Sequence, residues 1–208
     1  MSDDPDTSFS FSRQGILFII SAPSGAGKTT LAHHIFQAVP DLRPSVSYTT
    51  RAPRTGETNG RDYYFVSEEQ FTQMRTAGAF AEWAHVHEFF YGTPRVPLDE
   101  AVAQGHDLLL DIDVQGAKQL KATYPEAVSI FVLPPSWHKL EQRLRRRGTD
   151  HEEIITRRLQ RAREEAREFS TYDYWIVNDS VERAVSVLHA ILIAERARVV
   201  RLRNRSIV

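Results

Sequence analysis

The 208-residue sequence contains no cysteine. Disulfide bonds, thiolate metal sites and cysteine nucleophiles are therefore all excluded. Because disulfides belong mainly to oxidising compartments, a chain without cysteine is expected to be cytoplasmic.

Long apolar runs are missing as well. No stretch approaches the roughly 20 apolar residues that are needed to span a bilayer. The first residues are acidic and polar, without the basic and apolar regions of a signal peptide. These absences predict a soluble protein with no membrane partner and a disordered tail over 1–13.

The sequence also has little net charge. Its 26 basic and 27 acidic residues give a formal charge of -1, which argues against a nucleic-acid partner attracted by the overall field of the protein. Any basic binding site must then be local. The hydrophobic fraction of 41% is enough for the core of one domain, assigned to 14–208.

The most informative segment that is present is S-A-P-S-G-A-G-K-T-T over 21–30, directly after the apolar run 16–20. Gly25 and Gly27 allow backbone N–H groups to curve around phosphate oxygens. A helix expected over 29–39 would point its free N–H groups at the same anion. The pattern predicts a phosphate-binding loop, although Ala22 stands where the strict motif has its first glycine.

The rest of the chain shows the alternation of strands and helices that is typical of an α/β fold. Short buried strands alternate with helical patterns, which predicts a P-loop NTPase-type parallel sheet with helices on both faces. The strands are expected at 16–20, 107–113, 127–133 and 174–178. The helices are expected at 29–39, 96–104, 117–123, 137–146, 151–169 and 181–203. The carboxyl ends of these strands would bring Lys28, Asp111, Asp113 and Asn178 together.

Two stretches do not fit this alternation of strands and helices. Residues 47–97 are expected to form an inserted α+β lobe, and the highly charged residues 137–172 a helical lid. The core would then comprise 14–46, 98–136 and 173–208. The basic residues from Arg196 to Arg205 are most simply explained as an exposed helix end, with an oligomer contact left open.

A proline-containing loop carries Arg51 and Arg54, three residues apart. Arginine binds phosphate oxygens in a bidentate manner, and the phenol of Tyr63 can add an uncharged donor. A solvated basic loop would be the ordinary explanation, but the neighbouring phosphate loop favours a second phosphate site.

Six ordered motifs between about residues 15 and 198 make the chain resemble guanylate kinase. They are S-A-P-S-G-A-G-K at 21–28, S-x-T-T-R-x-P-R at 47–54, G-x-D-Y-x-F at 60–65, E-W at 82–83, Y-G-T at 91–93 and D-I-D-x-Q-G at 111–116. The resemblance implies magnesium-dependent phosphoryl transfer from ATP to GMP.

The resemblance also implies roles for individual residues. The GMP site would comprise Ser47, Arg51, Arg54, Tyr63, Glu82, Tyr91, Thr93 and Asp113. The ATP site would comprise Ala22, Pro23, Ser24, Gly25, Ala26, Gly27, Lys28, Thr29, Thr30 and Asn178. A carboxylate such as Glu82 can accept both the N1–H and the N2 amine of guanine, whereas adenine offers an acceptor there.

Other residues would neutralise charge during the reaction. The catalytic set would be Lys28, Arg51, Arg143, Arg147 and Arg158, the last three resembling the family's lid. Thr29 and Asp111 are expected to hold Mg²⁺, directly or through water. No general base is required, because the attacking oxygen belongs to an anionic phosphate.

Three alternatives stay open. A catalytically inactive guanylate-kinase-like module would bind a phosphorylated partner, but the presence of Lys28, Thr29 and the lid arginines argues against it. A kinase for another nucleoside monophosphate is disfavoured by Glu82. Asn178 could be a strand-end turn or helix cap rather than an adenine-side residue.

Overall fold

The structure, a computed structural model, describes residues 12–86, 88–146 and 152–203. Its centre is a five-stranded sheet with the order β2-β7-β1-β8-β9, in which every pair is parallel. The strands are β1 (Leu17–Ser21), β2 (Leu42–Pro44), β7 (Asp107–Asp111), β8 (Val128–Leu133) and β9 (Tyr174–Val177). The predicted parallel sheet is confirmed, with β1 fully buried in the middle.

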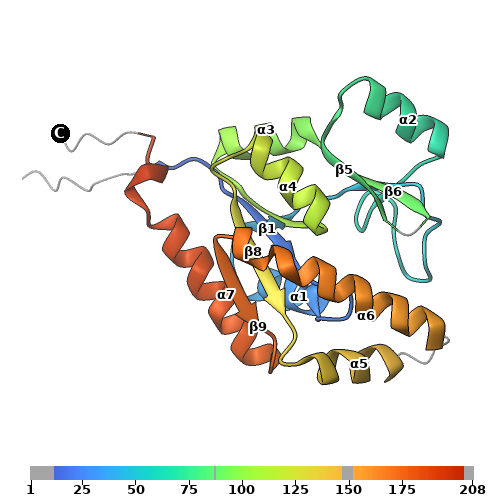
Figure 1. The fold of residues 1–208 in the computed structure, drawn as a ribbon. Helices are drawn as coiled ribbons and strands as arrows, with labels where there is room; N and C mark the ends of the chain where they lie inside the picture. The colour runs from blue at the N-terminus through green and yellow to red at the C-terminus, as the bar shows by residue number, and fades with distance from the viewer. Residues whose placement is uncertain (1–11, 87, 147–151, 204–208) are drawn as a thin grey trace, which may run out of the picture.

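Helices cover both faces of this sheet, as expected (Figure 1). Helices α1 (Lys28–Ala38) and α7 (Val181–Arg196) pack with Phe18 and Ile20 on one face. Helices α3 (Arg95–Gln104) and α4 (Val114–Thr123) pack with Leu17 and Ile19 on the other. Successive residues of a strand point to opposite faces, so an unbroken apolar run such as β1 requires cover on both sides.

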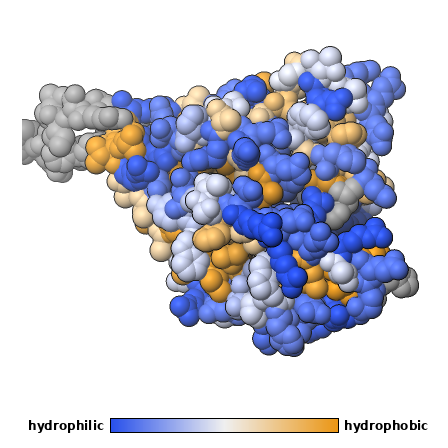
Figure 2. Space-filling model, in the orientation of Figure 1, coloured by the Kyte–Doolittle hydropathy of each residue, from blue (hydrophilic) through white to orange (hydrophobic). Residues whose placement is uncertain are grey.

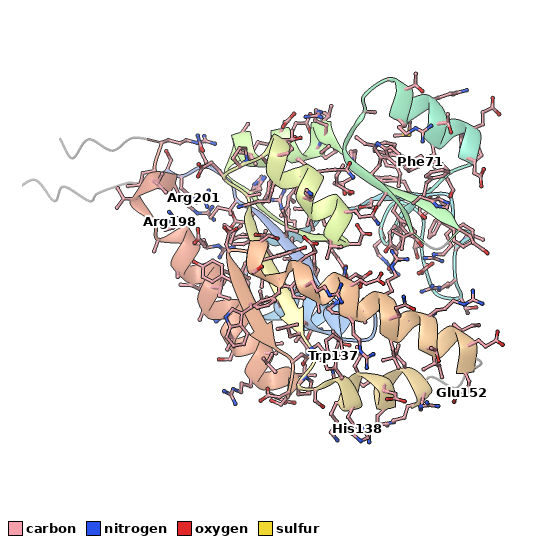
Figure 3. The ribbon with its side chains drawn as sticks, in the orientation of Figure 1. Phe71, Trp137, His138, Glu152, Arg198 and Arg201 are labelled. Atoms are coloured by element: carbon pink, nitrogen blue, oxygen red, sulfur yellow. The ribbon has the colours of Figure 1, made fainter. Side chains whose placement is uncertain are left out.

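A second, four-stranded sheet with the order β4-β3-β6-β5 lies within the segment assigned to the inserted lobe. Its strands are β3 (Tyr48–Thr49), β4 (Tyr64–Phe65), β5 (Phe80–Val86) and β6 (Phe89–Pro94), with α2 (Glu68–Thr76) beside them. Phe71 of α2, labelled in Figure 3, stacks on Phe80 and Phe90 of the sheet.

Two antiparallel helices make up most of the predicted lid. They are α5 (Trp137–Arg146) and α6 (Glu152–Ala166), followed by the short 3-10 helix η1 (Arg167–Thr171). Leu140 and Leu144 of α5 pack against Ile155 and Ala162 of α6. The guanidinium of Arg163 lies 5.9 Å from the centre of the Trp137 ring, which adds a cation–π contact between the two helices. Arg147 lies outside the described residues, as do residues 1–11 of the expected tail.

Several short elements were not predicted, namely β2, β3, β6 and α2. Strands β2 and β3, of three and two residues, are too short to show a detectable alternation. Strand β6 has six residues, but its sequence F-F-Y-G-T-P does not alternate apolar and polar residues. Helix α2 begins with a capping box in which Ser67 accepts from the Gln70 backbone and the Gln70 side chain accepts from the Ser67 backbone. The sequence S-E-E-Q shows that signal, which the sequence analysis overlooked.

The helix predicted over 181–203 is too long, and the prediction that the basic residues from Arg196 to Arg205 form an exposed helix end is wrong. Helix α7 stops at Arg196, and a separate 3-10 turn, η2 (Val199–Arg201), follows. Arg201, labelled with Arg198 in Figure 3, is 6% exposed and its guanidinium binds Glu195 at 3.1 Å and the Glu126 carbonyl at 3.0 Å. The basic residues here therefore serve internal packing as well as solvation.

Asp107 ties both ends of the described chain to the sheet. Its fully buried carboxylate accepts from Arg13 at 2.6 and 2.7 Å, from Arg196 at 2.6 Å and from the Ile16 N–H at 2.9 Å. Arg13, which the sequence analysis placed in the tail, is thus anchored, and it also pairs with Leu202 in an isolated bridge.

We expect Asp107→Asn to lower the free energy of unfolding by about 3–5 kcal/mol, because it leaves two partly buried guanidinium groups without a counter-charge. Urea denaturation of the two proteins measures the difference. Asp41→Asn is the control, since Asp41 is exposed and has φ of 65°, which asparagine tolerates. A loss no larger than that of the control would show that Asp107 is not the anchor.

No helix within the described residues is long and apolar enough to cross a membrane. Hydrophilic residues cover most of the face shown in Figure 2, and hydrophobic ones form small separate patches.

Candidate functional site

The loop between β1 and α1 has the geometry that its glycines predict. Gly25 and Gly27 have φ of 89° and 97°, in the left-handed region. A Cβ at Gly25 would lie 2.9 Å from Leu144 Cδ2 of the lid, and one at Gly27 would collide with the Asn178 amide. Glycine is therefore required both for the backbone turn and for the close approach of neighbouring elements.

Lys28 begins α1 and reaches across to the carboxyl end of β7. Its Nζ lies 2.5 Å from Asp111 Oδ1 and donates to the Ile112 carbonyl at 3.0 Å. The Thr29 side chain is exposed in the same helical turn. The structure thus brings Lys28 and Asp111 together at the carboxyl edge of the sheet, as the strand pattern predicts.

Helix α5 is tied to the loop between β1 and α1 through Arg143. Its Nη1 donates to the Ala26 carbonyl at 3.2 Å and its Nη2 to the Asn178 carbonyl at 2.9 Å. The Asn178 amide donates to the same Ala26 carbonyl at 2.7 Å. Arg143 and Asn178 therefore both lie at the loop, where they support its backbone.

A first cavity opens above the loop, lined on one side by loop residues and on the other by α6. Arg158, Arg161 and Glu165 come from the lid helix, and Asp113 and Val86 from the edge of the core and the lobe. The loop side consists of Ala22, Pro23, Ser24, Gly25, Gly27, Lys28, Thr29 and Thr30. This cavity holds most of the residues expected at an ATP site.

Two lid residues in this cavity were not identified from the sequence. Arg161 donates to Glu165 at 3.0 Å, and the Ser24 backbone N–H lies near enough to the Glu165 carboxylate to lower its pKa. Burial raises the pKa of Glu165, while Arg161 opposes the shift. The spacing of Arg158 and Arg161 places both on one helical face, a signal that the sequence analysis did not use.

A second cavity lies between the two sheets. It is lined by residues from the lobe and from the end of β7, listed here in chain order: Lys28, Ser47, Tyr63, Glu82, Ala84, Val86, Tyr91, Asp111, Ile112 and Asp113. Lys28, Val86 and Asp113 line both cavities. The two cavities therefore adjoin each other at the lysine of the phosphate loop.

Glu82 is the buried carboxylate of the second cavity. It is 4% exposed and accepts a short hydrogen bond from the Thr93 hydroxyl, which lies 3.1 Å from Ser47 Oγ. Burial raises the pKa of Glu82 to about 7, partly offset by the Thr93 hydrogen bond. Glu82, Thr93 and Ser47 thus form one connected polar group, as the prediction of a base-reading site requires.

Arg51 lies behind this cavity and does not line it. Its guanidinium donates to Glu57 at 2.9 Å and to the Ala52 carbonyl at 2.7 Å, and lies 5.5 Å from the Tyr63 ring centre. Glu57 also accepts from the Arg54 backbone at 2.7 Å, and the Arg51 hydrogen bond lowers the pKa of Glu57. Glu57 was not identified from the sequence, although it orients the arginine loop.

Similar proteins agree on one family. A family model described as guanylate kinase matches residues 14–195. The guanylate kinase of Syntrophotalea carbinolica is 56% identical over 93% of this chain and 92% of its own length. That of Geobacter metallireducens is 53% identical over 91% and 94%. The crystal structure of guanylate kinase from Anaplasma phagocytophilum superimposes with a TM-score of 0.77 at 35% identity, covering 93% of each chain. The chain belongs to the guanylate kinase family.

Proposed function

We propose that the protein transfers the γ-phosphoryl group of ATP to GMP, giving ADP and GDP. The observation that carries this proposal is the junction of the two cavities at Lys28. One cavity is built on a phosphate loop, and the other contains a buried carboxylate. Donor and acceptor bound in them would meet at a lysine, where charge develops during phosphoryl transfer.

In the donor site, the loop N–H groups and the first turn of α1 would bind the phosphates of ATP. Lys28 would shift from Asp111 toward the β- and γ-phosphate oxygens. Thr29 and Asp111 offer a hydroxyl and a carboxylate oxygen, which are the ligand types that Mg²⁺ prefers. Held by these residues, Mg²⁺ would supply positive charge that neutralises the phosphates.

In the acceptor site, Glu82 would accept the N1–H and N2 amine of guanine, with Ser47, Thr93 and Asp113 beside the base. Arg51, Arg54, Tyr63 and Tyr91 would hold the GMP phosphate. Because Arg51 and Arg54 do not line the cavity, their guanidinium groups would have to turn inward when GMP binds.

The chemical step needs positioning and charge neutralisation rather than a base. A phosphate oxygen of GMP attacks the γ-phosphorus, and the bond from that phosphorus to the bridging oxygen breaks as ADP leaves. Arg158 already faces the donor cavity. With Arg143 and Arg147 it would neutralise the transferring group when the lid closes, and closure would exclude water that could otherwise be phosphorylated.

Consumption of ATP in the presence of GMP, AMP, dTMP or no acceptor tests this function. We expect rapid turnover with GMP alone, because adenine would leave the buried Glu82 carboxylate unpaired. No turnover with any acceptor would favour an inactive binding module, and a preference for AMP or dTMP would assign a different kinase activity.

A further inference from the structure

Gly116 lies in the first turn of α4, against the carboxylate of Glu82. It is buried, and its N–H donates at 2.9 Å to Asp113, the N-cap residue of the helix. A Cβ at this position would lie 3.0 Å from Glu82 Cδ and closer still to Oε2. The space that the carboxylate occupies therefore exists because residue 116 has no side chain.

The backbone does not require glycine here. Gly116 is within a regular helix and is absent from the glycines with positive φ in the described chain. Glycine is unfavourable in a helix relative to alanine. A glycine at this position thus weakens α4, and the close approach of Glu82 provides a physical reason for it.

Glu82 cannot withdraw from α4 to make room. The next residue of β5, Trp83, exchanges two hydrogen bonds with the side chain of Gln119 in α4, at 3.2 and 2.8 Å. On the other side, Glu82 pairs with Thr93 of β6, whose hydroxyl donates to it. With the strand fixed on both sides, a methyl group at residue 116 can be accommodated only by moving the carboxylate toward the cavity.

We infer that Gly116 is a positioning residue for guanine recognition: its missing side chain sets how deep the Glu82 carboxylate lies, and so how well that carboxylate meets the base. The inference rests on the proposed role of Glu82 in GMP binding and adds a second residue to it. Gly116 itself would touch neither substrate.

The direct test is Gly116→Ala. We expect KM for GMP to rise about 10- to 100-fold, the penalty that a shift of about 1 Å can impose. KM for ATP and the melting temperature should stay near their original values, since alanine favours the helix. Lys118→Ala, at an exposed position of the same helix, is the matched control and should leave both KM values unchanged.

A double-mutant cycle locates the effect at the carboxylate. Glu82→Asp shortens the side chain by one methylene group, so it should harm GMP binding less in the Gly116→Ala protein than in the original one. Equal effects in the two backgrounds would overturn the inference.

Other outcomes separate the inference from the proposed function. If Gly116→Ala leaves KM for GMP within twofold while Glu82→Gln raises it, the inference is wrong and the function stands. If Glu82→Gln has no effect either, the assignment of the guanine site is wrong. Should Gly116→Ala fail to fold, recovery of folded protein in Gly116→Ala/Glu82→Ala would place the clash at the carboxylate, and failure to recover would overturn the inference.

Discussion

Replacing Lys28 by alanine is expected to lower kcat about 10²- to 10³-fold, the usual cost of removing one donor that stabilises transition-state charge. No other described side chain lines both cavities and carries a positive charge. Steady-state assays with saturating ATP and GMP measure the loss.

The same substitution should hardly change stability. Lys28 pairs with Asp111, whose side chain is 38% exposed and can be solvated once the lysine is gone. Exposed ion pairs contribute about 0–1 kcal/mol. Urea denaturation should therefore show a nearly unchanged free energy of unfolding in the variant that has lost activity. If the fraction of folded protein fell as much as the activity, the loss would come from unfolding and would contradict a catalytic role. Lys118→Ala is again the control.

Glu82→Gln is expected to lower kcat/KM for GMP about 10- to 100-fold, because hydrogen bonds to a charged group contribute roughly 1.5–3 kcal/mol and the amide loses one acceptor. Activity with AMP should change much less, so that the preference for GMP decreases. Measuring both acceptors with each protein gives the ratio directly. An unchanged ratio would remove Glu82 from its proposed role.

The buried position of Glu82 adds a pH dependence to this prediction. Because burial raises its pKa to about 7, the carboxyl group of the free enzyme is mostly protonated at pH 6 and mostly ionised at pH 8. Guanine needs an ionised acceptor, so kcat/KM for GMP should rise across that range. The Glu82→Gln variant should lack this rise in kcat/KM between pH 6 and pH 8. The phosphate of GMP also titrates, near pH 6, and its contribution is removed by comparing the pH profiles of the original protein and the variant.

The sequence was sufficient for four of the five strands of the central sheet and for the phosphate loop, because both depend on local patterns. The apolar strand 16–20 and the glycines at 25 and 27 each have a direct physical reason within a few residues. The inserted lobe could be placed because residues 47–97 depart from the alternation of strands and helices. The order of the strands was not predicted, because periodicity does not show which strands are neighbours.

The contacts between distant segments could not be predicted. Glu57 and Glu165 look like ordinary surface carboxylates in the sequence, and only the fold places one beside Arg51 and the other beside the Ser24 N–H. Gly116 ends the motif D-I-D-x-Q-G, but the physical reason for a glycine there is Glu82, on a strand more than 30 residues away. In the sequence, Arg201 looks like an exposed charge on a helix. It is buried because helix α7 ends at Arg196 and the chain turns after it.

The strand order β2-β7-β1-β8-β9 has a consequence for synthesis on the ribosome. Both neighbours of β1 are encoded far downstream, and β7 begins at Asp107, 86 residues after Ser21 ends β1. At about 5–20 residues per second, the nascent chain carries this apolar segment without a partner for about 4–17 s. During that interval the apolar side chains of β1 have no strand beside them, and the sheet can form around β1 only after translation has passed the middle of the chain.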